Sequence, residues 1–395
     1  MDCERGRGNP TTLISSKQEI SYMKRDSRID LIRTLSMLMV VILHVIGYGF
    51  MNYDSVQDKG SIFDLLPFSF LIPEVFSFCA VNCFAMVSGY LLYDSQFHWS
   101  RILKLYVHTG FYTVLFLLVF LLFKREAVSA GDIIFALIPI LDYWYVKAYF
   151  GVLFFLPALC NLVVFFSSRL RHCIVLLGIF CFTSMLPGNI WGTGTAGCTL
   201  WLAILFIVGG VIRKNEALLR QSKWGKPKWF FLGYFLCAAG LFLICVVYRV
   251  IPDNFQRFLP DSRSILMYSS PFVTLEAVCL FIGILLSKPH EGKFQRIISR
   301  IAPYAFGVYL LHMDPFVKKY LLADVWNRLG LPQSGISVVP AVLGLSVLIF
   351  SIGIAVDYLR SLFFSFSRID SLLQKSNRWD KVFFVAGKDH AGTDL

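Results

Sequence analysis

Long apolar stretches alternate with short polar segments along most of the chain. Most of them are long enough to cross a bilayer as an α-helix, which takes about 20 residues, and the fifth and sixth fall short of that length. The stretches cover residues 31–50, 70–93, 105–123, 144–166, 172–187, 198–212, 229–248, 270–287, 301–317 and 338–358. This pattern predicts an all-α, polytopic membrane protein with about ten transmembrane helices.

The distribution of Lys and Arg between these stretches predicts the orientation of the helices. With a cytoplasmic N-terminus, the segments on the inner side hold 26 Lys and Arg residues and those on the outer side hold 9. Cytoplasmic loops are enriched in these residues, so both termini are expected in the cytoplasm and the chain in the cell membrane. We therefore expect an N-terminal tail over 1–29, a membrane domain over 30–358 and a C-terminal tail over 359–395.

Composition supports this class. The chain of 395 residues is 56% hydrophobic and 16% charged, and its mean hydropathy is +0.65, which is too apolar for a soluble domain. Its net charge of +12 is explained by the cytoplasmic loops and by anionic lipid rather than by nucleic acid. The ten cysteines lack the spacing of a zinc site, and we expect no metal.

The first apolar stretch carries two ionisable side chains, Arg33 and His44. Eleven helical steps place them on nearly the same face, roughly 16 Å apart along the axis. An ionisable residue at membrane depth usually faces the protein interior or a wet cavity and indicates function. The alternative is that Arg33 pairs with Asp30 and that His44 is a buried histidine without a chemical role.

The end of the second stretch and the start of the third hold a further set of polar residues. Asn82 lies near the middle of the membrane, and Ser88 precedes a glycine that allows close helix approach. Arg101 and Lys104 follow, three residues apart. They are either an ordinary cytoplasmic pair of cations or a clamp for phosphate groups.

Three later stretches add candidates. Lys147 and Tyr149 lie where the fourth stretch enters from the outer side, where aromatic residues usually anchor a helix and a lysine can reach either water or a cavity. His312 lies at a depth similar to that of His44, so the two imidazoles would line one cavity if their helices are neighbours. Glu276 is a buried acid that could act at this site or simply bind a neighbouring helix.

Four segments together resemble the membrane-bound acyltransferase-3 family, close to its branch that acts on bacterial surface polysaccharides and exopolysaccharides. They are the spacing from Arg33 to His44, NCFAMVSGYLL, WYVKAYFGVLFFLPALCN and FGVYLLH, in the order of the family. The resemblance implies a ten-helix enzyme that esterifies a carbohydrate hydroxyl, commonly with acetyl from acetyl-CoA. It also implies that His44 is the essential histidine and Arg33 its partner. Lys104 stands where the family often has arginine.

The chemistry of acyl transfer fits these residues. Transfer from a thioester to an alcohol requires a base, for which His44 is suited, and groups that orient it or bind the oxyanion, here Asn82 or His312. The anionic donor would be held by Arg33, Arg101 and Lys104, with Ser88 beside them. Lys147, Tyr149 and Glu276 remain candidates for binding or orienting the acceptor, which is expected to be a polysaccharide or a lipid-linked oligosaccharide.

Two other function classes remain open from the sequence. A proton-coupled secondary transporter would also carry intramembrane His, Glu and Lys residues, although the two halves of the chain show no internal repeat. A non-catalytic scaffold of a surface-polymer assembly is the third class. The acceptor sugar, the acyl group and the oligomeric state are not fixed by the sequence.

Overall fold

The computed structural model describes residues 26–52, 66–186, 191–192, 198–251, 266–289 and 292–376. Most of both predicted tails therefore lies outside the described residues. Within the described residues every regular element is a helix. The chain is an all-α, polytopic membrane protein, as the apolar pattern predicts.

Five segments of the described chain are long and apolar enough to cross a membrane. Two of them are composite, because α2 (Ser27–His44) continues as the π-helix η1 (Val45–Phe50), and α5 (Phe68–Ser77) leads into α6 (Ala80–Leu92). The other three are α7 (Trp99–Phe123), α13 (Pro227–Val250) and α21 (Val338–Phe366).

The remaining predicted stretches are also helical, but they are shorter, bent or broken. The bent pair α9 (Trp144–Phe154) and α10 (Leu156–Ser167) would count as a sixth span. The others are α11 (Leu170–Ser184), α12 (Thr199–Gln221), α16 (Pro271–Leu286), α17 (Lys293–Ile301) and α18 (Ala305–His312). Short helices α8 (Ala130–Leu137), α19 (Pro315–Val317), α20 (Val325–Arg328) and α22 (Ile369–Lys375) complete the described part. The count of ten spans stays a prediction.

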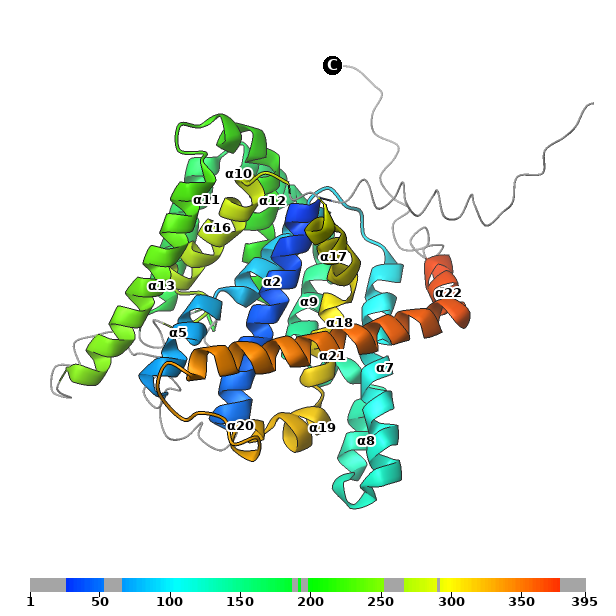
Figure 1. Ribbon diagram of the computed structural model, residues 1–395. Helices are drawn as coiled ribbons and strands as arrows, with labels where there is room; N and C mark the ends of the chain where they lie inside the picture. The colour runs from blue at the N-terminus through cyan, green and yellow to red at the C-terminus, as the bar shows by residue number, and fades with distance from the viewer. Residues whose placement is uncertain are drawn as a thin grey trace, which may run out of the picture.

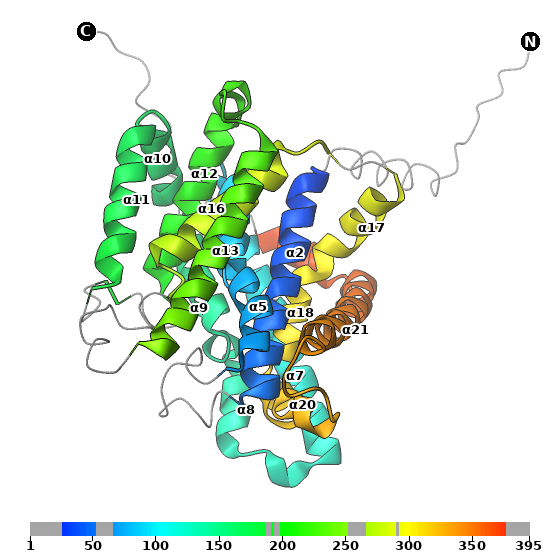
Figure 2. The same ribbon diagram turned by 60° about the vertical axis from the view of Figure 1, so that its left-hand side comes forward.

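The two composite spans form the centre of the bundle. In α2 with η1, 72% of the apolar window is buried within the protein, and in α5 with α6 the share is 78%, against 22% for α13. Figures 1 and 2 show α2 in the middle of the bundle, and Figure 1 shows α21 lying across it. The first two apolar stretches therefore carry the side chains that can line an interior site, while α13 presents most of its surface to lipid.

Prolines explain two of the breaks. The axes of α9 and α10 differ by 74°, and Pro157 in the first turn of α10 cannot extend the hydrogen-bond ladder of α9. The ninth stretch is not one continuous helix either, because a 3-10 turn with Pro303 precedes α18 and Pro315 follows it at the start of α19. His312 is thus the last residue of a short helix.

Gly89 and Gly209 bring α6 and α12 into backbone contact. A Cβ atom on Gly89 would lie 1.9 Å from the carbonyl oxygen of Phe206, and one on Gly209 would lie 2.1 Å from that of Met86. Neither glycine can gain a side chain unless the helix backbones separate. The prediction that the small residues near Ser88 permit close helix approach is confirmed at Gly89.

We expect Gly89→Ala to lower the free energy of unfolding by about 1–3 kcal/mol, because the added methyl group must push two helix backbones apart. Gly240→Ala is the matched control, since a Cβ there meets nothing within 4 Å, and alanine is the better helix former. Thermal unfolding of both variants in the same detergent measures the effect. Equal melting temperatures would contradict the close-contact interpretation.

Ion pairs join four helices at the end of the bundle where α2 begins. Glu216 of α12 accepts hydrogen bonds from Tyr90 of α6 at 2.6 Å and from Arg220 at 2.8 Å, and lies 3.5 Å from Arg28 of α2. Arg28 and Arg220 both donate to the carbonyl of Leu285 at the end of α16, each at 2.6 Å. Burial raises the pKa of the Asp26 carboxyl, but hydrogen bonds from Arg28 outweigh it and hold this pKa below its usual value.

Candidate active site

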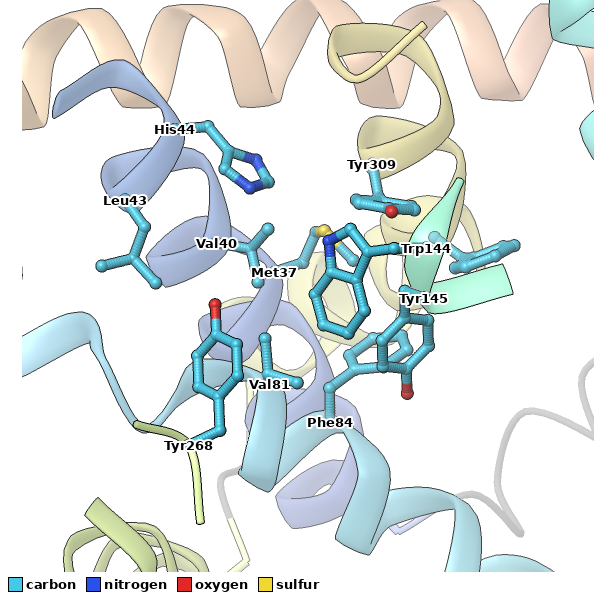
Figure 3. A pocket seen from close by; sticks show the side chains of 11 residues that line it. Met37, Val40, Leu43, His44, Val81, Phe84, Trp144, Tyr145, Tyr268 and Tyr309 are labelled. Atoms are coloured by element: carbon cyan, nitrogen blue, oxygen red, sulfur yellow. The ribbon is translucent and has the colours of Figure 1, made fainter. Parts of the chain in front are cut away.

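Two cavities adjoin one another inside the bundle. The first is a small chamber of about 20 Å³ lined by His44 together with apolar and aromatic side chains. Figure 3 shows this chamber, with His44, Met37 and Tyr309 pointing into the same space. The second cavity, of about 380 Å³, is lined by Arg33, Arg101 and Lys104. The spacing from Arg33 to His44 along α2 thus places one residue in each cavity.

His44 and His312 form a hydrogen-bonded pair. His44 Nδ1 lies 2.8 Å from His312 Nε2, and His312 Nδ1 lies 2.6 Å from the carbonyl oxygen of Val308. The two imidazoles are therefore in direct contact, but only His44 lines the chamber, and His312 lies behind it. Directly after His44 the helix widens into the π-helix η1, a distortion that is frequent at functional sites.

The Val308 carbonyl fixes the protons of this pair. A carbonyl oxygen only accepts hydrogen bonds, so His312 must carry its proton on Nδ1. With both rings neutral, His312 Nε2 is then an acceptor, and His44 Nδ1 must donate to it. This leaves the lone pair of His44 on Nε2, and that nitrogen is the basic atom of the pair.

The larger cavity gathers the residues predicted to bind the donor, together with Tyr149, which was predicted to bind or orient the acceptor. Arg33 comes from α2, Ser88 from α6, Arg101 and Lys104 from the first turns of α7, and Tyr149 from α9. Tyr149 lies beside Ser88 and near Arg33 and Arg101. The cavity therefore combines three cations with hydroxyl groups, which suits an anionic ligand with several phosphate oxygens.

Three aromatic residues separate the two cavities. Phe84, Tyr145 and Phe306 line both of them. The ring of Phe84 stacks on Phe306 with a centroid distance of 6.4 Å and meets Tyr145 edge-on at 5.7 Å. A ligand that occupied both cavities would pass between these three rings.

Asn82 supports the chamber without lining it. Its Nδ2 donates to the carbonyl of Tyr268 at 2.7 Å, and its Oδ1 accepts from Trp201 Nε1 at 3.0 Å. Tyr268 lines the chamber. Asn82 is therefore placed to hold a wall residue rather than to touch a ligand of the chamber.

The structure does not bring Glu276 or Lys147 to either cavity. Glu276 is fully buried in α16, close to Cys79 and Cys237 of the neighbouring helices α5–α6 and α13. Lys147 is exposed on α9, whereas Tyr149 of the same helix lines the larger cavity. Of the three residues proposed to bind or orient the acceptor besides Asn82, only Tyr149 lines a cavity.

His108 lines the larger cavity, which is a basic cavity because Arg33, Arg101 and Lys104 line it. Its position in the sequence had not marked it as a candidate. Its Nε2 lies 2.8 Å from Oδ1 of Asp357, which also accepts from Tyr112 at 2.9 Å and from Arg360 at 2.7 Å. The signal was present in the sequence, because His108 follows Lys104 by one helical turn and Arg101 by two. The partner carboxylate could not be found, since it lies 249 residues away.

Lys318 is a cation near the histidine pair on the side of the chamber away from Arg33. Its ammonium lies 5.0 Å from the centre of the Tyr48 ring, and that ring lies 5.6 Å from the ring of His44. Within the described residues, no group of three or more His, Cys, Asp and Glu side chains could hold a metal ion.

Comparison with known proteins identifies one family. Residues 26–356 match the family model Acyl_transf_3, described as an acyltransferase domain. No curated protein matches the chain, and no solved structure does. The matched range contains both cavities and both histidines of the pair.

Proposed function

Because the chain belongs to the acyltransferase-3 family, we propose that it transfers an acetyl group from acetyl-CoA to a hydroxyl of a cell-surface or exported carbohydrate. Family membership favours acyl transfer over the transporter alternative. The observation that carries the finer proposal is the pairing of a histidine chamber with a basic cavity along one helix. We place the protein in the cell membrane, with both termini and the basic cavity on the cytoplasmic side.

The donor would occupy both cavities. The phosphates of CoA bind Arg33, Arg101 and Lys104, and the pantetheine arm passes Phe84, Tyr145 and Phe306. The thioester then lies in the chamber beside His44. The distance fits an extended arm, since Arg33 and His44 are roughly 16 Å apart along the helix.

His44 would act as the general base. Its Nε2 takes the proton of the acceptor hydroxyl while the oxygen attacks the thioester carbonyl, and it returns this proton to the leaving thiolate. His312 keeps His44 in the required tautomer and stabilises the cation that forms, because Val308 fixes the proton on His312 Nδ1. Arg33 binds the donor and does not take part in proton transfer.

The acceptor would approach from the side away from the basic cavity. A carbohydrate has many hydroxyl groups and a polar surface, so it must reach His44 from the membrane surface opposite the donor. Aromatic side chains such as Trp144 and Tyr268 line that chamber and suit the apolar faces of sugar rings.

The assay that tests the proposal uses purified protein in liposomes with labelled acetyl-CoA and a panel of polysaccharides and lipid-linked oligosaccharides. Transfer of label to an alkali-labile ester on the carbohydrate is the expected result. Acetyl-CoA turnover with label on an amine instead would overturn the O-acyl assignment. Absence of any donor turnover across the panel would overturn the proposed function.

We expect the enzyme to prefer acetyl over butyryl donors by about 30-fold or more in kcat/KM, because two more methylene groups must push aside the apolar and aromatic side chains that line the chamber. Met37→Ala enlarges the chamber and should narrow this preference mainly by raising butyryl turnover. Competition between the two donors measures the ratio. An unchanged ratio in the variant would contradict the position of the acyl group beside Met37.

A further inference from the structure

Two tyrosine hydroxyls in the chamber have no acceptor for their protons among the residues that the structure describes. They belong to Tyr145 and Tyr309, whose side chains are 6% and 4% exposed. A buried hydroxyl without a partner has lost its hydrogen bonds to water without a replacement, so such groups are rare and call for an explanation. Both side chains line the chamber that contains His44.

Tyr309 is the one that lies beside the proposed base. Its ring centre is 6.4 Å from that of His44 and 6.2 Å from that of His312. His312 follows Tyr309 by one helical turn in α18. Figure 3 shows the ring of Tyr309 across the chamber from His44, whereas the hydroxyl of Tyr145 points away from His44.

The ring of Tyr309 is held in place by other aromatic side chains. Tyr143 meets it edge-on at 5.8 Å, and Phe306 stacks on it at 6.1 Å. Tyr143 is itself fixed, because its hydroxyl donates to the carbonyl of Leu310 at 2.9 Å. A donor whose position is fixed before the reaction stabilises developing charge without the cost of reorientation.

We propose that the Tyr309 hydroxyl is the hydrogen-bond donor that stabilises the oxyanion formed from the acyl carbonyl. This inference rests on the proposed function and deepens it. Attack of the acceptor oxygen forms a C–O bond and moves the carbonyl π pair onto oxygen, where Tyr309 donates a hydrogen bond to it. Collapse restores the C=O bond and breaks the C–S bond, and the thiolate takes the proton that His44 had removed. Tyr309 keeps its own proton throughout.

From the sequence, this role was expected of Asn82 or His312. The side-chain nitrogen of Asn82 donates to the carbonyl of Tyr268, and its side-chain oxygen accepts from Trp201. The two ring nitrogens of His312 are hydrogen-bonded to His44 and to the carbonyl of Val308. The proton of the buried Tyr309 hydroxyl has no acceptor in the described part of the chain, and an oxyanion site requires such a donor.

The test compares Tyr309→Phe with Tyr145→Phe in the full-length protein. Each variant loses one buried hydroxyl that has no acceptor, but only the first loses it beside His44. We expect Tyr309→Phe to lower kcat by about 10²–10³-fold, both for acetyl transfer and for hydrolysis of acetyl-CoA without acceptor. The Kd for CoA should stay within about twofold of the wild type. The loss should exceed that of Tyr145→Phe by at least about tenfold.

The outcomes separate this inference from the proposed function. If the wild type transfers acetyl and Tyr309→Phe retains kcat within about threefold, the oxyanion role is wrong and the function stands. Equal losses in the two variants, or a loss that resides in the CoA affinity, would also overturn the role. If the wild type shows no donor turnover, the function and the inference fall together. Melting temperatures of both variants equal to that of the wild type would show that the loss of kcat does not come from a loss of folded protein.

Discussion

His44→Ala is expected to lower acyl transfer by at least about 10³-fold while the amount of folded protein in the membrane stays unchanged. General-base catalysis contributes about 10²–10⁴ to the rate, and the variant also loses the proton return to the thiolate. Alanine is small and apolar and is tolerated inside a membrane helix. Initial rates at saturating acetyl-CoA, normalised to protein amount, measure the effect.

A matched variant tests the role of the hydrogen-bonded pair. His312→Ala leaves His44 in place but removes the acceptor of its Nδ1 proton, so His44 is free to adopt the other tautomer. We expect a smaller loss than in His44→Ala, with the double variant no slower than His44→Ala alone, because the two residues act as one unit. Multiplicative losses in the double variant would show that they act independently. Full activity of His44→Ala would overturn the assignment of the base.

The geometry of this pair could be predicted only in part. The similar depth of His44 and His312 in two apolar stretches indicated that both could line one cavity if their helices are neighbours. The direction of the hydrogen bonds could not be predicted, because it depends on Val308, whose backbone carbonyl carries no sequence signal. The break of α18 directly after His312 depends on Pro303 and Pro315, which a hydropathy pattern averages over.

The basic cavity was more predictable than the chamber. Helical spacing puts Arg101 and Lys104 on one face of α7, the predicted topology puts Arg33 at the same membrane surface, and the structure brings all three to one cavity. The spacing of polar residues within a helix carries this information. The six aromatic side chains around the chamber carry no such signal, since aromatic residues are common throughout this chain.

The positions of Glu276 and Lys147 relative to the site could not be predicted from the sequence. An intramembrane acid or lysine indicates function by default, but the depth of a residue does not reveal which face of its helix it occupies. Glu276 faces the contact with α13, and Lys147 faces outward. The number of spans has a similar limit, because the fourth and ninth stretches bend or break where prolines interrupt them, and five segments of the described residues are long and apolar enough to span a membrane.

The second large effect is expected at the basic cavity. Arg33→Gln, and the double change Arg101→Gln with Lys104→Gln, should each raise the KM and the Kd for acetyl-CoA by about 10–100-fold, since a charge-assisted hydrogen bond to phosphate contributes about 1.5–3 kcal/mol. The acceptor KM should change by less than about threefold, because the carbohydrate does not enter this cavity. Calorimetry with CoA and initial rates at varied acceptor give the two constants.

The control for these variants must remove charge at the same end of the molecule without touching the cavity. Lys223→Gln with Lys226→Gln does so, since both lysines are exposed between α12 and α13, beside the end where α2 begins (Figure 1). If the donor were attracted only by the overall positive charge of this end of the molecule, the control double change would weaken donor binding as much as the cavity variants do. Added salt would then remove the loss of affinity in all of these variants. A donor-specific loss that persists at about 0.3 M salt, where exposed charges are screened, indicates direct contact of Arg33, Arg101 and Lys104 with the CoA phosphates. Unchanged donor constants in both cavity variants would place the donor elsewhere.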